Sequence, residues 1–335
     1  MAMALSDEWS YHQTIKAFAS EAEPPFESAE QQRLVWGREW GCPNDVGTLR
    51  VVLLCRPPDD LATVVDTTRW DSELEAYADR EAGWYWRHCE PPDLKKMREQ
   101  HDRLAAALRN EGVELTYVSD TVPGHIKSQS TRDQVVAVRG GAIICRMGAR
   151  LRRGEEAPVT RAVAALGMPI LRTINGSGIF EGGSFAMINE QTAVVGIGAR
   201  ANAEGARQVE EVLRPLGVEL LKVELNGYKQ HIDGAFVMAD VDVALINPIG
   251  LPFWFLEKLK ALKVRTVECH PDDPPFTVNC LAVRPGRVIM SRTSARTVER
   301  LGKAGVEVIS LDYEHVYRGG GGVHCSTAPL VRDRV

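Results

Sequence analysis

The chain has 335 residues, of which 44% are hydrophobic and 25% are charged, and its 40 Lys and Arg against 45 Asp and Glu give a net charge of -5. This composition is typical of a globular protein of enzyme size and excludes a disordered or fibrous chain. The dispersed, slightly acidic charge excludes the basic footprint of a nucleic-acid binder and favours a small-molecule partner.

Seven cysteines, an odd number without any C-x-x-C pair, argue against a disulfide framework and against a structural zinc site. The N-terminus carries neither the basic nor the apolar segment of a secretion signal. No stretch approaches the roughly 18 apolar residues of a membrane span. We therefore expect a cytoplasmic protein with reduced thiols and no membrane contact.

Residues 1–47 contain three tryptophans and little periodicity. We expect them to form an N-terminal extension that packs on the outside of the protein. The remaining residues, 48–335, are expected to form a single catalytic domain. That domain begins with a short apolar run at Leu49, which is typical of a buried strand.

From Leu49 onward a unit of strand, helix and strand recurs five times. The first helix is expected over residues 93–110, where Leu94, Met97, Leu104 and Leu108 lie on one face. A period of roughly 50 residues indicates a repeat architecture. The helices end at Gly112, Gly167, Gly217, Lys263 and Gly305.

Five α/β units of this size favour either an open solenoid or a closed ring, because no unit can bury a core alone. The ring is the better hypothesis. Its first strand, at Leu49, lacks a partner, and the strand-like segment after Cys325 could pair beside it and cover both edges.

Polar and ionisable residues stand at matching places in the five units, at or just before each hairpin. In a ring of equivalent units these places converge on the axis. The segments are Thr131-Arg132-Asp133, Glu181-Gly182-Gly183-Ser184, His231-Ile232-Asp233, Val278-Asn279-Cys280 and Val323-His324-Cys325.

Each of these residues alone has an ordinary structural explanation, since single carboxylates are usually solvated and single cysteines usually buried and inert. Their shared register instead favours a reaction centre. If His231 and Asp233 lie on a strand, both side chains point from one face into the same cavity. A His, Asp and Cys metal site is a secondary alternative.

Cys325 is the candidate nucleophile, because four glycines at 319–322 precede it closely. Glycine allows positive φ and close approach to a ligand, so the thiol can be presented at a crowded point. The alternative is a glycine-rich linker followed by an inert thiol.

The pattern resembles the guanidino-modifying enzyme superfamily, which includes arginine deiminases, dimethylarginine dimethylaminohydrolases, agmatine deiminases and amidinotransferases. The resemblance spans about residues 36–333 and implies a five-bladed α/β propeller (pentein) with quasi-fivefold repeats, which agrees with the repeat count. The matching segments are Thr131-Arg132-Asp133 (T-R-D), Glu181-Gly182-Gly183 (E-G-G-D), His231-Ile232-Asp233 (H-x-D), Gly198-Ala199-Arg200 and Gly320 to Cys325.

One residue departs from the family pattern. Ser184 stands where many members have the second carboxylate of E-G-G-D, which affects the set of substrate contacts. By the resemblance, Arg132, Arg200 and Ser184 are expected to contact the substrate. Arg200 and the cluster that contains Arg153, at positions 150, 152 and 153, would offer rim charges to a substrate carboxylate.

Together these residues could support attack of the Cys325 sulfur on a guanidinium carbon. Asp133 and Asp233 would hold the planar cation in bidentate fashion, and its charge would favour the Cys325 thiolate. His231 would protonate the leaving nitrogen and then activate water. Glu181 would orient the imidazole. This chemistry requires neither a metal nor an organic cofactor.

Three functions remain open. Hydrolysis would give a ureido product and release an amine or ammonia, whereas an amidinotransferase would pass the amidino group to an acceptor amine. Hydrolysis is preferred because no acceptor signature is recognisable. A binding propeller without enzymatic activity is the third possibility. The partner is expected to be a small cationic guanidino compound, and assembly as a homo-oligomer stays open.

Overall fold

The structure is a computed structural model that describes residues 12–13, 16–17, 24–65, 69–81, 83–86, 88–226 and 229–335. Much of the expected extension at 1–47 lies outside the described residues. Its described part contains helix α2 (Ala29–Trp36), which begins after the N-cap Ser28. Gly41 then bridges to Val331 near the C-terminus.

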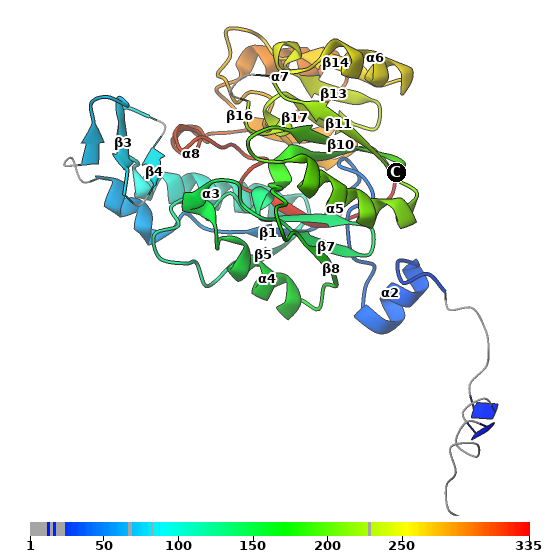
Figure 1. The fold of residues 1–335 in the computed structure, drawn as a ribbon. Coiled ribbons are helices and arrows are strands. Elements are labelled where there is room, and N and C mark those ends of the chain that lie inside the picture. Colours follow the sequence, from blue (N-terminus) through cyan, green and yellow to red (C-terminus); the bar gives the residue numbers. More distant parts are fainter. Residues whose placement is uncertain are drawn as a thin grey trace, which may run out of the picture.

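The described residues form six three-stranded sheets in a mixed α/β fold (Figure 1). In four sheets, a hairpin is followed by a helix and by a third strand parallel to the second. These units are β6 (Val135–Val138), β7 (Gly141–Ile144), α4 (Glu156–Ala165) and β8 (Ile170–Thr173); β9 (Phe185–Asn189), β10 (Thr192–Ile197), α5 (Ala203–Leu213) and β11 (Glu219–Glu224); β12 (Phe236–Asp240), β13 (Val243–Ile246), α6 (Phe253–Ala261) and β14 (Arg265–Glu268); β15 (Leu281–Arg284), β16 (Arg287–Ser291), α7 (Ala295–Lys303) and β17 (Glu307–Leu311).

A fifth sheet follows the same plan with strands from both ends of the chain. Strand β1 (Leu49–Leu54) pairs antiparallel with β18 (Ala328–Arg332) and parallel with β5 (Glu114–Tyr117). Helix α3 (Leu94–Asn110) connects β1 to β5. The prediction that the strand after Cys325 pairs with the strand at Leu49 is therefore confirmed.

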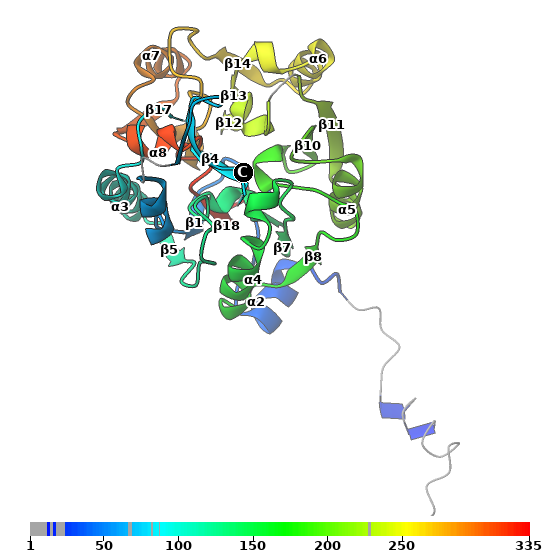
Figure 2. The same cartoon turned by 60° about the vertical axis from the view of Figure 1, so that its left-hand side comes forward.

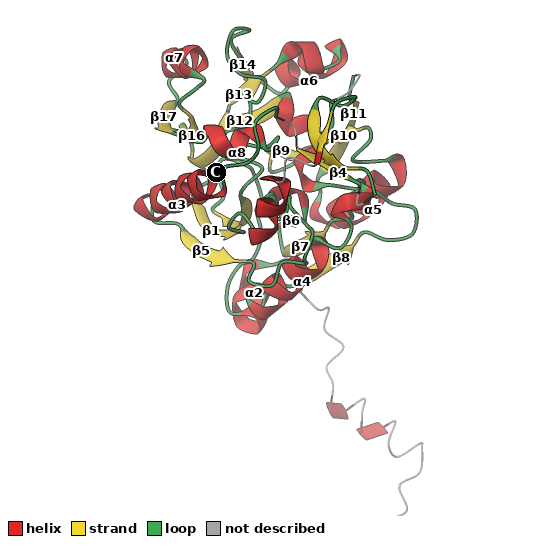
Figure 3. Cartoon of the chain, turned by 90° about the vertical axis from the view of Figure 1, so that its left-hand side faces the viewer, coloured by secondary structure: helices red, strands yellow, loops and turns green. Residues whose placement is uncertain are grey.

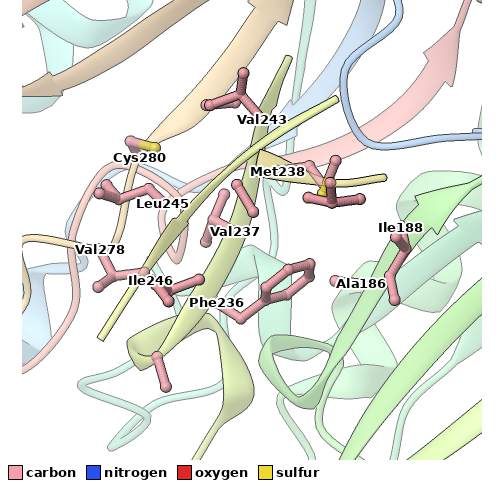
Figure 4. Close-up of a cluster of buried hydrophobic side chains, with 14 of the residues drawn as sticks. Ala186, Ile188, Phe236, Val237, Met238, Val243, Leu245, Ile246, Val278 and Cys280 are labelled. Atoms are coloured by element: carbon pink, nitrogen blue, oxygen red, sulfur yellow. The ribbon is translucent and has the colours of Figure 1, made fainter. Parts of the chain in front are cut away.

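The helices lie outside the sheets. Figure 2 shows α3, α4, α5, α6 and α7 at the periphery and the strands toward the middle, and Figure 3 shows the same separation by colour. The hairpin strands of each repeat unit are buried almost throughout, whereas the third strands β5, β8, β11, β14 and β17 are partly exposed. In Figure 4, Phe236 and Met238 of β12 reach toward Ala186 and Ile188 of β9, which belong to one buried cluster.

The helix-ending residues of the repeat have a common conformation. Gly112, Gly167, Gly217 and Gly305 have φ between 73° and 93°, and Lys263 has a φ of 61°. Positive φ after the last helical turn is the usual C-terminal arrangement, which glycine adopts most easily. Lys263 therefore occupies the glycine position of the repeat and takes the same left-handed conformation, at the cost of backbone strain.

An additional sheet is inserted between β1 and α3. It consists of β2 (Trp70–Asp71), β3 (Ala76–Asp79) and β4 (Trp84–Trp86), and it projects to one side in Figure 1. Trp86 is fully buried, and a side chain at Gly319 would meet its ring at 3.0 Å. The insertion thus packs against the glycine run, just after the short helix α8 (Glu314–Arg318).

The pairing of β18 with β1 should be essential for folding. Leu330 is fully buried, and Arg332 donates hydrogen bonds to the carbonyls of Gly47 and Ala282, each at 2.7 Å. A chain that ends at Thr327 should lose its cooperative thermal transition in calorimetry, because the lost burial costs several kcal/mol against a total stability of about 5–15 kcal/mol. A chain that lacks only residues 334 and 335, which are exposed, is the control. An unchanged transition in the longer truncation would show that this pairing does not hold the fold together.

Candidate active site

Three short turns bring ionisable residues to the middle of the protein. The 3-10 turns η3 (Thr131–Asp133), η5 (Gly182–Ser184) and η7 (Ile232–Gly234) each come directly before the first strand of a sheet. The turn η5 contacts both η3 and η7. The repeat therefore places equivalent turns around one centre, as the register of the sequence predicts.

The expectation that His231 and Asp233 lie on a strand is wrong. His231 has extended backbone dihedrals and is the N-cap residue of η7, which contains Asp233. A 3-10 turn rotates successive side chains by about a third of a turn, so the two side chains have separate partners. His231 contacts Glu181, and Asp233 contacts His324 and Asn279.

Glu181 and His231 form a buried ion pair. Nε2 of His231 lies 2.7 Å from Oε2 of Glu181, while Oε1 accepts hydrogen bonds from Nη1 of Arg200 at 3.1 Å and from the backbone N–H of Gly148 at 2.9 Å. Burial alone would raise the pKa of Glu181, but the hydrogen bond to His231 and the charge of Arg152 hold it below its usual value. The carboxylate is thus ionised and fixed on both oxygens.

His231 is an imidazolium at neutral pH. Burial alone would lower its pKa, but the charge of Asp133 and the hydrogen bond to Glu181 outweigh burial and raise the pKa to about 9. Nδ1 lies 3.6 Å from Oδ1 of Asp133, which is too long for a hydrogen bond. His231 therefore has a proton to give to a group that enters beside it.

Asp133 is held on one oxygen only. Its Oδ2 accepts a 2.6 Å hydrogen bond from Nη1 of Arg152, whereas the buried Oδ1 has no hydrogen-bond partner among the described residues. Arg152 also donates to the buried Glu155, with 2.8 Å between Nη2 and Oε2. A buried carboxylate oxygen without a donor is costly, so Oδ1 is suited to a donor that the substrate brings.

The Asp133, Glu181 and His231 ligand atoms lie within 4.8 Å of one another, so they could in principle hold a metal ion. Nη1 of Arg152 already lies 2.6 Å from Asp133 and 3.6 Å from Oε2 of Glu181. This guanidinium supplies the positive charge that the two carboxylates require and would repel a second cation. The donor set consequently fits a guanidinium better than a metal.

Cys325 lies in a separate network of polar groups. Its Sγ is 3.1 Å from Nδ2 of Asn279 and 3.5 Å from Oδ2 of Asp233, and its backbone N–H donates to Oδ1 of Asn279 at 3.2 Å. Asp233 Oδ2 also pairs with Nδ1 of His324 at 2.9 Å. Burial, followed by the charges of Asp233 and Asp133, raises the pKa of Cys325 well above its usual value. The free protein thus holds a neutral thiol.

The glycine run serves this network in two ways. Gly320 has a φ of 88°, and a side chain at Gly322 would lie 2.5 Å from Oδ1 of Asn279. The first position needs positive φ and the second needs close approach. The backbone N–H of Arg132 donates to the carbonyl of Cys325 at 3.1 Å, so the turn that carries Asp133 also holds the nucleophile loop.

Two cavities meet at Cys325 and His231. The first cavity has a volume of about 70 Å³ and is lined by Tyr85, Lys127, Ser130, Asp133, Leu151, Arg152, Arg200, Gln230, His231, Gly319, Gly320 and Cys325. The second cavity has a volume of about 120 Å³ and is lined by Lys229, Gln230, His231, Asp233, Gly234, Pro275, Phe276, Asn279, Gly320 and Cys325.

The structure brings most of the predicted site residues together. Cys325 and His231 line both cavities, Asp133 and Arg200 line the first, and Asp233 lines the second. Glu181 is fully buried behind His231.

Three further predicted residues lie elsewhere. Arg132 is buried without lining either cavity; its backbone N–H donates to the carbonyl of Cys325, and its guanidinium charge acts on the buried Asp233 and His324. Ser184 is also buried, and its Oγ has no hydrogen-bond partner among the described residues. Arg153 is exposed.

Three residues of the site have roles that the sequence does not predict. Arg152 is expected on the rim as one of three arginines, but it is buried between carboxylates. Asn279 and His324 occupy register positions of the repeat, yet neither was assigned a role. The register was the available signal for Asn279 and His324. For Arg152, the signal was Glu155 three residues later, a spacing that allows an ion pair within one turn.

Comparison with known proteins gives a consistent result. The family model described as arginine deiminase matches residues 127–249 and 268–332. An uncharacterized protein, YkgA, of Bacillus subtilis is 27% identical over 298 residues, covering 87% of this chain and 95% of that protein. The N(G),N(G)-dimethylarginine dimethylaminohydrolase of Streptomyces coelicolor is 30% identical over 234 residues, covering 69% of this chain and 85% of the enzyme.

Solved structures agree with these sequence matches. The DDAH of Pseudomonas aeruginosa, a mutant complexed with citrulline, superposes with a TM-score of 0.68 at 25% identity, covering 84% of this chain and 99% of that one. The inosamine-phosphate amidinotransferase of Streptomyces griseus has a TM-score of 0.66 at 17% identity, covering 89% and 98%. The second likeness concerns the fold alone.

If Glu181 pairs with His231, removal of the carboxylate should lower the pKa of His231 measurably. In Glu181→Gln the imidazolium loses a carboxylate partner, so the pKa of His231 should fall from about 9 toward its ordinary value of 6.5. The charge of Asp133 would keep part of the elevation. NMR titration of the His231 ring in the variant and in the wild type measures the change. A His231 pKa that stays near 9 would show that Glu181 does not control the imidazole.

A side chain at Gly183 is expected to disturb the positions of Asp133 and His231. A side chain at this position would lie 2.7 Å from both Oδ1 of Asp133 and Nδ1 of His231. Gly183→Ala should therefore displace one of them and lower turnover by about 100-fold, since small misplacements of reacting groups cost that much. Thermal unfolding, measured in parallel, separates displacement from loss of the fold. Full activity in a folded variant would mean that the positions of Asp133 and His231 are not critical.

Proposed function

The chain belongs to the arginine deiminase family of guanidino-modifying enzymes, and from this premise we propose that it is a cysteine-dependent hydrolase of an arginine-type guanidino compound. The membership makes it an enzyme that hydrolyses C–N bonds of linear amidines. The observation that carries the proposal is the convergence of the Cys325 thiol, the His231 imidazolium and the unpartnered Oδ1 of Asp133 on one cavity.

The architecture belongs to the proposal as well. The five strand and helix units are the blades of a five-bladed α/β propeller, or pentein, with quasi-fivefold symmetry. Residues 48–335 form a single catalytic domain, and residues 1–47 are an extension on its outside. The likeness to the amidinotransferase and DDAH structures supports this arrangement.

The first half-reaction begins with binding of the guanidinium. Its N–H groups donate to Oδ1 of Asp133, and its charge stabilises the Cys325 thiolate that burial and Asp233 otherwise disfavour, so that the thiol releases its proton to solvent. Asn279 stabilises the same thiolate through the donor that lies 3.1 Å from Sγ. The sulfur attacks the guanidinium carbon, and His231 gives its proton to the nitrogen that leaves.

The second half-reaction uses the same histidine in the reverse sense. Having lost its proton, His231 accepts one from a water molecule, which adds to the amidino carbon. The bond between that carbon and Sγ then breaks with its electrons on sulfur, and the hydroxyl on the carbon loses its proton as the ureido carbonyl forms. The sulfur takes up a proton, which regenerates the thiol. Glu181 remains ionised throughout and holds the ring in orientation, the role that a carboxylate has toward histidine in other acyl-transfer sites.

The hydrolase is favoured over an amidinotransferase by the sequence matches. The curated relatives in the 27–30% range include dimethylarginine dimethylaminohydrolases, whereas the amidinotransferase structure shares 17% identity. Arg200, which lines the first cavity with its guanidinium near Glu181, is the proposed partner for an anionic tail. Arg152 is less suited to that role, because three carboxylates surround it.

The cellular setting is proposed from the thiols. All seven cysteines are free, and Cys89 is exposed, which fits a reducing compartment such as the cytoplasm. Within the described residues, no helix combines the length and the apolar composition that crossing a membrane requires. The proposed partner is a small cationic guanidine.

Substrate assays on a panel test this function. Arginine, methylated arginines, agmatine and guanidino acids would each be supplied with and without an acceptor amine such as glycine. We expect a ureido product that does not need the acceptor, and a preference for compounds with a carboxylate. Product that forms only with the acceptor would assign the protein to the amidinotransferases, and a preference for agmatine would remove the anionic tail.

Two variants test the assigned roles. Cys325→Ser should abolish turnover, because a hydroxyl at this site is not ionised, while binding of the guanidine measured by calorimetry remains within about threefold. Asp133→Asn should weaken that binding by about 100-fold, since it removes a charge-assisted hydrogen bond. Turnover in Cys325→Ser, or unchanged binding in Asp133→Asn, would contradict the mechanism.

A further inference from the structure

The nucleophile loop, residues 319–325, contains four consecutive glycines that lead to Cys325. Because glycine has more conformational freedom than any other residue, such a loop needs contacts from outside to keep the sulfur in one place. The backbone N–H groups of Gly319 and Gly320 donate to carbonyls of helix α8, at 3.0 Å and 2.8 Å. These bonds attach the beginning of the loop to the helix, and further support comes from the inserted sheet.

Trp86, the last residue of strand β4 in the inserted sheet, packs directly against this loop. A side chain at Gly319 would lie 3.0 Å from two carbons of its ring, and Figure 1 shows β4 beside α8. The indole N–H of Trp86 donates to the carbonyl of Glu90 at 2.9 Å. The Glu90 carboxylate in turn pairs with Arg318, the residue before the glycines. Trp86 and Glu90 therefore hold the point where α8 passes into the loop.

Lys127 binds both Trp86 and the loop. Its Nζ lies 4.9 Å from the centroid of the Trp86 ring, a distance at which the ammonium is attracted to the ring face. The same Nζ donates a hydrogen bond to the Gly319 carbonyl. Trp86 and Lys127 thus form a clamp on Gly319, in which each residue also fixes the other. Lys127 precedes the turn η3, so the clamp ties the nucleophile loop to the segment that leads to Asp133.

The other tryptophan of β4, Trp84, has a different partner. Trp84 and Trp86 alternate with Tyr85 along the strand, so both tryptophans lie on the face opposite to Tyr85, which lines the first cavity. Trp84 is also buried, and Arg69 covers its ring with 5.5 Å between Cζ and the ring centroid. Arg69 comes directly before β2 and belongs to the insertion itself. Trp84 thus stabilises the insertion, whereas Trp86 connects the insertion to the nucleophile loop.

We infer that Trp86 and Lys127 are positioning residues for Cys325, and that the inserted sheet holds the sulfur where it can reach the guanidinium carbon. This inference rests on the proposed function and gives the insertion a part in the same reaction. Trp86 lines neither cavity, so it acts through Gly319 and not on the substrate. Without the clamp the loop would open, the thiol would be more accessible to a small reagent, and fewer bound guanidines would lie within reach of the sulfur.

Labelling of the free protein with iodoacetamide, followed by peptide mass spectrometry, measures how firmly the loop holds Cys325. In Trp86→Leu the labelling rate of Cys325 should rise by about tenfold, because a thiol that is 7% exposed becomes accessible when its loop opens. Trp84→Leu, the same change at the other tryptophan of β4, should leave this rate at the wild-type value. Cys145 and Cys280 are fully buried and should stay unlabelled wherever the fold is intact. Equal rates at Cys325 in the two variants would overturn the inference.

Lys127→Met decides the question if Trp86→Leu labels the two buried thiols as well and so does not fold. This variant keeps the alkyl stem of a half-buried side chain and removes the ammonium that binds Gly319. Labelling of Cys325 should again be faster by about tenfold, with the two buried thiols protected. A rate equal to that of the wild type would show that the clamp does not hold the loop.

Turnover provides a second readout. With the guanidine that the substrate panel identifies, Trp86→Leu should lower kcat by about 100-fold, since small misplacements of reacting groups cost that much, while KM stays within about threefold. Trp86→Phe keeps an aromatic ring against Gly319 and should restore most of the lost turnover. A KM that rises at unchanged kcat would assign Trp86 to substrate binding and overturn the inference. If the wild type hydrolyses no guanidine, the proposed function is wrong, and the labelling rates still decide whether the clamp holds Cys325.

Discussion

Neutralisation of buried carboxylates is the constraint on which the centre of this protein depends. Asp133, Glu155, Glu181 and Asp233 are each at most 4% exposed. An isolated charge in such a place would be too costly to keep. Arg152 pairs with the first three of these carboxylates, and His231 is held as an imidazolium beside two of them. Removing one partner would leave an uncompensated buried charge, so the network must be assembled as a whole.

The same constraint prepares the site for its chemistry. His231, the acid that must protonate the leaving nitrogen, is already protonated in the free protein because neighbouring carboxylates raise its pKa. The Cys325 thiol is kept neutral by burial and by the charge of Asp233. A bound cationic substrate favours ionisation of the Cys325 thiol, while His231 stays protonated. The unpartnered Oδ1 of Asp133 is the place where that cation replaces a missing donor. The positive charge of the substrate therefore both binds at Asp133 and favours the Cys325 thiolate, which links substrate binding to activation of the nucleophile.

Much of this organisation could be predicted from the sequence, and the limits have physical reasons. Glycines at the helix ends marked the repeat, and the pairing of β1 with β18 followed from the unpartnered first strand. The repeat could not reveal that Asp233 lies in a 3-10 turn with His231 as its N-cap residue, since a strand of period two and a short turn have similar local patterns. Nor could it show that Arg152 is buried, because an arginine beside two others is usually solvated. The role of Asn279 depends on a contact between segments 46 residues apart in the chain.

The central claim is that Cys325 forms a covalent bond to the guanidino carbon during turnover. Acid quenching of the enzyme within one turnover of arginine, followed by peptide mass spectrometry, tests it directly. We predict that the peptide containing Cys325 gains the mass of the amidino group with its tail after loss of ammonia, and that this species disappears as the ureido product forms. Turnover without such an adduct, or an adduct on one of the other six cysteines, would contradict the account.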